Sequence, residues 1–391
     1  MTTSTTNNKP RALIIGGSLS GLFTATTLRT IGWEVAIFER SPNELDSRGG
    51  GVVLQGDVLS AFHFAGVQSM GALGVKSGDR IYLDRDDRVV QRSYMPQSQT
   101  SWNMLYSTMR QHLPAEIFHP GERFVRFEQH GDRITAHFAS GRVETGDLLV
   151  GADGPRSAVR EQVIPGLAPN YAGYVAWRGL VPEKELPASA ADVLAGTFAF
   201  QQGPGHLLLE YLVPGEDQSI QEGHRRWNWV WYLKVPHGEE FSALMTDRLG
   251  GRHAFSLPPG SLKDEDVANL MRKSTALLAP TFQTLIEATK EPFVQAILDL
   301  QVPRMVFGRA ILLGDAAFVP RPHTAGSTAK AAANALALAK ALQPLGADVD
   351  EALSDWQASQ WREGIGMTEW GMRMGDRIMG FERSNVVLNA V

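Results

Sequence analysis

The sequence of 391 residues contains no cysteine. Disulfide bonds, thiolate nucleophiles and cysteine-ligated metal sites are therefore excluded. The ten histidines include no pair at the i, i+4 spacing that places two imidazoles on one helix face. We expect no metal site, because no group of metal-ligating residues has a recognisable spacing.

Long apolar runs and a strong charge of either sign are also missing. No stretch reaches the roughly 18 consecutive apolar residues of a membrane-spanning helix. The first residues, MTTSTTNNKPRAL, lack the apolar region of a signal peptide. The net charge is −5, with basic and acidic residues mixed along the chain. We therefore expect a cytoplasmic protein that binds neither nucleic acid nor a membrane.

The sequence does contain parallel-strand patterns at both ends and an antiparallel pattern between them. Residues 12–15 form a short apolar run, followed by a glycine-rich turn, a helical pattern and a second strand over 35–38. This βαβ unit predicts a parallel sheet. Residues 196–215 and 224–236 alternate in polarity between Gly/Pro turns, which indicates antiparallel strands. We predict an α/β protein with a Rossmann-like domain, an inserted antiparallel-sheet domain and a C-terminal helical tail.

The order of these segments predicts discontinuous domains. The nucleotide-binding domain is expected over residues 1–75, 99–170 and 296–345. The inserted domain, which would bind the substrate, is expected over 76–98 and 171–295, with a helical segment over 346–391. The length of the chain is consistent with two domains.

The glycine-rich turn GGSLSG is the first of three signals for a dinucleotide. A turn of this kind lets the amides at a helix N-terminus approach a pyrophosphate, although Ser18 occupies the middle glycine position. A plain tight turn is the alternative. Glu39 ends the second strand about 20 residues on, where an acid binds ribose hydroxyls. The predicted cofactor residues here are Gly16, Gly17, Ser18, Leu19, Ser20, Gly21, Glu39 and Arg40, with a surface position as the alternative for Arg40.

The other two signals are GADGPRSAVRE, which begins at Gly151, and GDAAFVPRP, which begins at Gly314. Asp315 interrupts an apolar segment, and a buried carboxylate is costly without a partner. We expect that partner to be a ligand; a helix N-cap is the alternative role for this residue.

The three motifs, in this order, resemble the group A FAD-dependent aromatic monooxygenases of the p-hydroxybenzoate hydroxylase fold. The segment NYAGYVAWRG is most similar to the branch that acts on N-heterocycles. The resemblance covers nearly the whole chain. It implies non-covalent FAD, NADH or NADPH as electron donor, and O2. It further implies hydroxylation of a small hydroxylated N-heteroaromatic or phenolic ring through a flavin C4a-hydroperoxide.

The resemblance also implies cofactor contacts. Asp315 would accept hydrogen bonds from the FAD ribityl chain, and the following helix would direct its N-terminus at the flavin. The segment RGGGVVLQ from Arg48 would lie beside the flavin ring. The remaining implied positions are Gly51, Val52, Arg110, Asp153, Gly154, Gly314, Pro322, Ala325 and Gly326. Ser107, Phe318 and Asn334 depart from residues common in the family, and Arg160 has a surface ion pair as its alternative.

Hydroxylation of this kind benefits from removal of the ring hydroxyl proton. The candidate catalytic residues are His206, Tyr211 and His323. The alternatives are a satisfied histidine at the sheet edge for His206 and a capping or packing role for His323. Tyr211 and Tyr232 have high intrinsic pKa values, which suit hydrogen bonding better than proton abstraction. Trp177 and Arg178 should point to opposite faces of one strand. Trp227, Trp229 and Trp231 share one face, which favours a core role.

Two other functions fit parts of the sequence. WNWVWYLKVP half matches the Trp-x-Trp-x-Ile-Pro motif of flavin-dependent halogenases of related fold. A non-catalytic flavin-binding redox sensor is the second alternative, because several motif positions depart from the family. The tryptophans and methionines after residue 355 are explained by core packing or by a homodimer surface.

Overall fold

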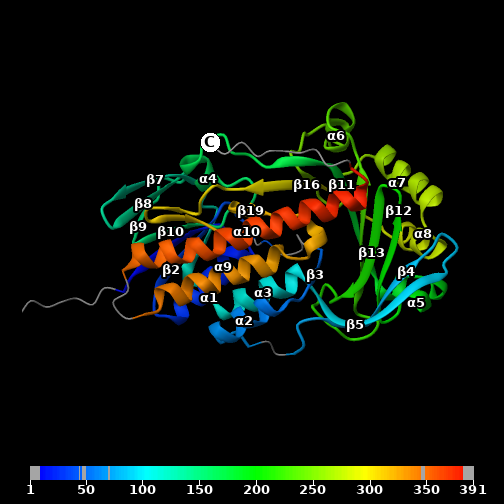
Figure 1. Ribbon diagram of the computed structural model, residues 1–391, viewed down its shortest axis with the longest axis horizontal. Coiled ribbons are helices and arrows are strands. Elements are labelled where there is room, and N and C mark those ends of the chain that lie inside the picture. Colours follow the sequence, from blue (N-terminus) through cyan, green and yellow to red (C-terminus); the bar gives the residue numbers. More distant parts are fainter. Residues whose placement is uncertain (1–8, 44, 46–49, 69–70, 345–347, 382–391) are drawn as a thin grey trace, which may run out of the picture. The chain divides into compact units, whose positions relative to one another are not determined.

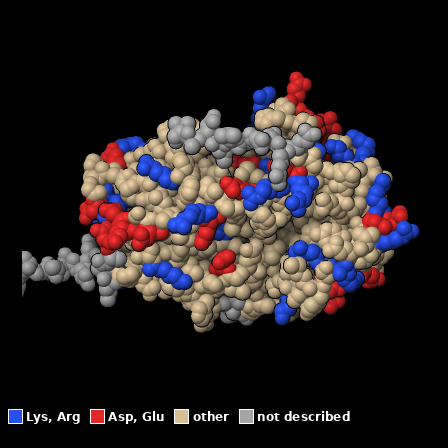
Figure 2. Space-filling model, in the orientation of Figure 1, with Lys and Arg blue, Asp and Glu red and all other residues tan. Residues whose placement is uncertain are grey.

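The computed structural model describes residues 9–43, 45, 50–68, 71–344 and 348–381. The chain forms two compact units. Unit 1 comprises Met1–Leu73, Ser101–Asn170 and Leu298–Thr368, and unit 2 comprises Gly74–Thr100, Tyr171–Ile297 and Glu369–Val391. No helix in the described part of the chain has the length and hydropathy that crossing a membrane requires. On the face in Figure 2, basic and acidic side chains are interspersed.

Unit 1 is built on a six-stranded sheet in the order β17-β18-β10-β1-β2-β6. Only the β17–β18 pair is antiparallel; the other neighbours are parallel. The strands are β1 (Arg11–Ile15), β2 (Glu34–Glu39), β6 (Phe118–Pro120), β10 (Leu148–Gly151), β17 (Val306–Phe307) and β18 (Ala310–Leu312). Leu13, Ile14 and Leu149 are fully buried, as continuous apolar strands of a parallel sheet should be.

Helices and a small antiparallel sheet complete unit 1. Helix α9 lies beside α1 and α2, and its alanines allow close packing (Figure 1). The helices are α1 (Leu19–Thr30), α2 (Gly56–Ala65), α3 (Trp102–His112), α4 (Ala158–Val163) and α9 (Ser327–Leu342), with the short turns η1 (Ala115–Ile117), η3 (Gly314–Ala316) and η4 (Pro322–Thr324). The small sheet contains β7 (Phe124–His130), β8 (Arg133–Phe138) and β9 (Val143–Gly146). The short strands β3 (Gly51–Val53) and β19 (Phe318–Val319) also belong to this unit.

Unit 2 is built on a large sheet in which neighbours run β15-β16-β11-β14-β13-β12-β4-β5. The pairs β15–β16, β11–β14, β14–β13, β13–β12 and β4–β5 are antiparallel, whereas β12 pairs with β4 in parallel. The strands are β4 (Val75–Leu83), β5 (Val89–Ser101), β11 (Asn170–Pro182), β12 (Thr197–Gly203), β13 (His206–Val213), β14 (Arg226–Lys234), β15 (Ser256–Leu257) and β16 (Phe293–Gln301). The helical elements are η2 (Glu183–Glu185), α5 (Ala188–Leu194), α6 (Glu239–Leu244), α7 (Asp264–Leu277) and α8 (Pro280–Glu287).

The register of β11, β13 and β14 sorts their side chains onto two faces. One, the tryptophan face, carries His206, Glu210, Trp227, Trp229 and Trp231. The other, the tyrosine face, carries Arg178, Tyr211, Asn228 and Tyr232.

The tryptophan face packs in one apolar cluster with residues of α5, α7 and α8. Trp229 is 0% exposed, and its Nε1 donates to Thr289 Oγ1 at 2.9 Å. The predicted core role of the three tryptophans is confirmed. A long C-terminal helix, α10 (Val349–Met379), begins in unit 1 and ends in unit 2. The predicted fold class, with its parallel-sheet domain, antiparallel insertion and helical tail, is confirmed as well.

Candidate functional site

The glycine-rich loop is packed too closely for side chains at two of its positions. A Cβ on Gly16 would lie 2.4 Å from Ala152 O, and one on Gly21 would lie 1.9 Å from Gly16 O. The loop leads into α1, whose first turn has no acidic residue and whose N-cap, Ser18, makes no side-chain capping bond. The amides at this helix N-terminus are therefore suited to an anion such as a pyrophosphate.

Glu39 is 7% exposed and holds this loop directly. Its Oε2 accepts from the Gly17 amide at 2.8 Å, and its Oε1 accepts from the Ser41 amide at 2.8 Å. Arg40, by contrast, is exposed. The Glu39 carboxylate is therefore fixed beside the glycine-rich loop. Its contact with a ribose stays a prediction.

The Phe118 ring lies between Arg110 and the glycine-rich loop. The Arg110 guanidinium lies 4.5 Å from the centre of the Phe118 ring, and a Cβ on Gly17 would lie 2.7 Å from that ring. Ser107, one turn earlier, donates its hydroxyl to Asn103 O at 2.8 Å within its own helix. Arg110 is therefore the cation that α3 brings toward the glycine-rich loop.

The Asp-Gly motif touches both other motifs. Asp153 Oδ2 accepts from the Ala158 amide at 2.7 Å, while its buried Oδ1 has no hydrogen-bond partner among the described residues. Burial raises the pKa of Asp153. Gly154 has φ +79°. Arg160 is 3% exposed and donates to Ala316 O at 2.9 Å, so the surface alternative for Arg160 is wrong.

The Gly-Asp motif completes the arrangement. A Cβ on Gly314, at φ +60°, would lie 2.3 Å from Ser20 Oγ, so this residue sits directly against the start of α1. The Gly314 amide donates to Asn334 Oδ1 at 3.1 Å. Three segments far apart in sequence therefore meet at the carboxyl ends of β1, β10 and β18, where nucleotide ligands bind in open α/β sheets.

Asp315 has partners within the protein, in addition to the ligand that the sequence predicts as its partner. Its Oδ1 accepts from Lys330 Nζ at 2.9 Å and from Ser327 Oγ at 2.7 Å. Lys330 lies 15 residues away on α9 and is not among the residues predicted from the sequence. Its position in an alanine-rich stretch is the signal that could have identified it as a buried cation. The predicted contact of Asp315 with the ribityl chain stays a prediction.

The loop before α9 is fixed from several sides. Arg321 forms a two-point ion pair with Asp299, with both distances 2.8 Å. Burial and the charge of Arg321 lower the pKa of His323 to about 3, so the imidazole is neutral and a weak base. Pro322 starts η4, and Ala325 has φ +51° with its carbonyl accepting from Gln55 Nε2 at 2.8 Å. Gly326, next in the chain, caps α9.

The predicted flavin-side segment from Arg48 is described only in part. Arg48 and Gly49 lie outside the described residues, whereas Gly51 and Val52 form part of β3 and are half-buried. The described residues contain no group of histidine and acidic side chains that would hold a metal ion.

The tyrosine face of unit 2 carries a cluster of polar groups. Burial raises the pKa of Tyr211, opposed by the charge of Arg178 and by a hydrogen bond with Asn228. Burial likewise raises the pKa of Tyr232 to about 12, again opposed by Arg178. The buried Nε of Arg178 has no hydrogen-bond partner within the described chain. The cluster therefore combines one guanidinium with two neutral phenols and a carboxamide.

Aromatic rings continue this face. Phe198 lies 4.8 Å from the Tyr211 ring, measured between centres, and 4.4 Å from the Phe200 ring, which it stacks on. Arg80 Cζ lies 5.4 Å from the Phe198 centre and 5.1 Å from the Phe200 centre. Tyr211 is among the site residues predicted from the sequence, whereas its partner Asn228 is not.

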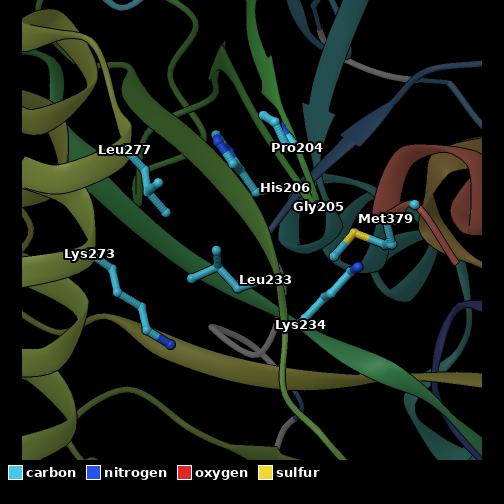
Figure 3. Close-up of a pocket in the computed structure, with 9 residues that line it drawn as sticks. Pro204, Gly205, His206, Leu233, Lys234, Lys273, Leu277 and Met379 are labelled. Carbon is cyan, nitrogen blue, oxygen red and sulfur yellow. The ribbon is translucent and has the colours of Figure 1, made fainter.

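His206 lies on the opposite face from Tyr211. It is 3% exposed, and its Nδ1 accepts from Trp231 Nε1 at 3.3 Å. Burial, and then the charge of Arg85, lower the pKa of His206. The imidazole lines a pocket of about 500 Å³ that is also bordered by Lys273 of α7 and Met379 of α10 (Figure 3). The structure therefore does not bring His206 and Tyr211 together.

Known proteins resemble this chain over part or nearly all of its length. The family model described as FAD binding domain-like matches residues 171–299. The chain is 31% identical over 382 residues to 2,6-dihydroxypyridine 3-monooxygenase of Paenarthrobacter nicotinovorans, covering 96% of this chain and 94% of the relative. It is 25% identical to 6-hydroxynicotinate 3-monooxygenase of Pseudomonas fluorescens, covering 87% of this chain and 84% of the relative.

A solved structure matches over almost the same length. The structure of 2,6-dihydroxypyridine-3-hydroxylase from Arthrobacter nicotinovorans has a TM-score of 0.90 and 29% identity, covering 97% of this chain and 96% of that chain. Together with the glycine-rich, Asp-Gly and Gly-Asp motifs that meet in unit 1, this similarity confirms the resemblance stated from the sequence. The chain belongs to the FAD-dependent aromatic monooxygenases and is a flavoprotein hydroxylase of that family.

Proposed function

We propose that this protein hydroxylates a small hydroxylated N-heteroaromatic ring of the hydroxypyridine class, using FAD, O2 and NADH or NADPH. The observation that carries the proposal is the cluster on the tyrosine face, where Arg178 lies among neutral hydrogen-bonding groups. Two relatives, a 2,6-dihydroxypyridine 3-monooxygenase and a 6-hydroxynicotinate 3-monooxygenase, support the ring class.

Unit 1 has the groups that FAD requires. The glycine-rich loop and the uncapped N-terminus of α1 suit the pyrophosphate, and Glu39 stands beside them for a ribose. Two carboxyl oxygens can accept hydrogen bonds from cofactor hydroxyls. They are Oδ1 of Asp153, which has no partner in the described chain, and Oδ2 of Asp315, since Lys330 and Ser327 donate to Oδ1. The N-terminus of α9, with Gly326 as its cap, has no acidic residue in its first turn and suits the anionic form of the flavin ring. We assign this unit as the FAD-binding domain and unit 2 as the substrate domain.

When bound and reduced by the nicotinamide nucleotide, FAD would activate O2, and O2 would supply the oxygen atom that the ring receives. The protein must position the ring and favour its electron-rich form. A ring hydroxyl that has lost its proton donates more electron density to the attacked carbon. Arg178 is the group that stabilises this oxyanion, because it is a partly buried cation whose Nε has no partner in the described chain.

The neighbouring groups support an anionic substrate without acting as bases. Tyr211 and Tyr232 keep their protons, because their pKa values are raised by burial, and they donate to the ring oxygens. His323 is too weak a base at a pKa of about 3, lowered by its burial and by the charge of Arg321. The ring proton therefore leaves to solvent, and Arg178 holds the anion that results.

The test is oxygen-dependent consumption of NADH and of NADPH by the FAD-loaded protein with hydroxypyridines, hydroxynicotinate, urate and simple phenols. Product masses are measured in parallel. We expect stimulation and one added oxygen atom for a hydroxypyridine, and none for the matched pyridine without a hydroxyl. Halide-dependent products, or no stimulation by any hydroxylated ring, would contradict the proposal.

A matched pair of variants tests the site itself. Arg178→Met should lower kcat/KM by about 100-fold or more, since a hydrogen-bonded partner of a buried charge is worth several kcal/mol. Arg92→Met removes an arginine from the same sheet whose side chain is 55% exposed. That control should retain activity. Equal activity in the two variants would remove Arg178 from the substrate site.

A further inference from the structure

Lys330 occupies a place where a lysine is unfavourable. It lies in the first turn of α9, and its side chain is 3% exposed. Burial opposes the charged form, and so does the partial positive charge of a helix N-terminus. Burial accordingly lowers the pKa of Lys330, while the charge of Asp315 and the hydrogen bond to it act in the opposite direction. A cation kept under these conditions calls for a specific reason.

The contacts of Lys330 all lead to the Gly-Asp motif. Its Nζ donates to Asp315 Oδ1 at 2.9 Å and also to the carbonyl of Phe318. Ser327, from the same turn of α9, donates to the same Oδ1 at 2.7 Å. The lysine thus joins the start of α9 to the segment that carries the motif.

The two oxygens of Asp315 are used unequally. Both side-chain hydrogen bonds that the described structure gives this carboxylate fall on Oδ1. The Asp315 side chain is 36% exposed, and neither of these hydrogen bonds uses Oδ2. One oxygen is held by the protein, and the other is left to accept a hydrogen bond from outside it.

We propose that Lys330 is a positioning residue of the cofactor site, which holds Asp315 in the rotamer that leaves Oδ2 for the hydroxyl groups of bound FAD. The inference rests on the proposed contact between Asp315 and FAD. Lys330 Nζ supplies one donor to Asp315 Oδ1, and Ser327 supplies the second donor to the same oxygen. A hydrogen bond from a charged donor is stronger than one from a neutral donor, which suits a side chain that fixes a rotamer.

The test is the affinity of the apoprotein for FAD, measured by quenching of flavin fluorescence, together with the melting temperature of the apoprotein. Lys330→Met should weaken FAD binding by about 10- to 100-fold, because Asp315 Oδ1 then loses its charged donor and only Ser327 still fixes the carboxylate. Lys330→Arg should restore part of the affinity. Lys340→Met, on the exposed side of the same helix, is the matched control and should bind FAD as the wild type does.

A double-mutant cycle separates positioning from general stability. If Lys330 acts through Asp315, Lys330→Met should change the FAD Kd by less than about twofold in an Asp315→Asn background. Equal losses in both backgrounds, or a lower melting temperature with unchanged affinity, would overturn the proposal. Wild-type protein that fails to bind FAD would instead contradict the proposed function. Wild-type binding that Asp315→Asn leaves intact would overturn the role of Lys330 alone.

Discussion

The two faces of the large sheet in unit 2 both bury polar groups, but in different surroundings. On the tryptophan face, Glu210 is 0% exposed and neither carboxyl oxygen has a hydrogen-bond partner among the described residues. On the tyrosine face, Tyr211 and Tyr232 lie close enough to Arg178 for its charge to affect both phenols. The first face therefore serves packing, with Glu210 as an unfavourable exception, whereas the second carries the connected set of polar groups that we propose as the substrate site.

The largest effect on stability should come from the tryptophan face. Trp229→Ala removes a fully buried ring and its bond to Thr289, and we expect a loss of about 3–5 kcal/mol in the free energy of unfolding. Urea unfolding followed by circular dichroism measures it. Trp370→Ala is the control, because Trp370 is 46% exposed. A loss below about 1 kcal/mol at Trp229 would contradict the assignment of this face to the core.

The tyrosine face should respond in binding rather than in stability. Tyr211→Phe removes a neutral donor to the ring oxyanion, and a hydrogen bond to a charged group contributes about 1.5–3 kcal/mol. We expect substrate affinity to fall about 10- to 100-fold with FAD affinity unchanged. Equilibrium titration of the oxidised holoenzyme checks this. Tyr94→Phe, with Tyr94 80% exposed, should bind normally. Normal binding by Tyr211→Phe would place the substrate elsewhere.

Glu210, on the tryptophan face, makes the stability of the protein depend on pH. Burial raises the pKa of Glu210 well above its ordinary value, so the folded protein binds this proton more tightly than the unfolded chain does. Its contribution to stability is therefore fully present below the unfolded carboxyl pKa of about 4.3 and declines as pH rises toward the folded pKa.

Glu210→Met removes that dependence and should stabilise the protein by about 1–3 kcal/mol at pH 8, with a smaller gain at pH 5. Urea unfolding at pH 5, 6, 7 and 8 measures the difference. Glu210→Gln, which cannot ionise but stays polar, should show the flat pH profile with less gain. A wild type and a Met variant with parallel pH profiles would mean that the buried carboxyl does not titrate in this range.

The sequence was most informative where function depends on neighbouring residues. The glycine-rich loop, Glu39 and the two Asp motifs are local patterns, and the structure places them at one sheet edge. Lys330 could not be assigned in the same way, because its partner Asp315 is 15 residues away and the pairing depends on how η3 meets α9. The positions of Arg178 and Asn228 on the same face as Tyr211 likewise follow only from the cross-strand register. It pairs Asn228 with Tyr211 and Arg178 with Val230.

One signal for the two faces was present in the sequence. His206 and Tyr211 are five positions apart on one strand, and an odd spacing places two side chains on opposite faces. His206 and Tyr211 therefore could not both contact a ligand bound on one face of the sheet. What the spacing could not show was which face the helices cover, since that depends on the packing of α7 and α8.

The smallest effect on activity should follow from His206→Ala. Its imidazole accepts a hydrogen bond from Trp231 on the packed face, so we expect a loss of about 1 kcal/mol in stability. The ratio of hydroxylated product to NAD(P)H consumed should stay within about twofold of the wild type, since a packing residue takes no part in the proton balance of the ring. Hydrogen peroxide formed in place of product, with FAD still bound, would return His206 to a catalytic role. It would also mean that a ligand reaches the tryptophan face, where the 500 Å³ pocket beside His206 is the place for it.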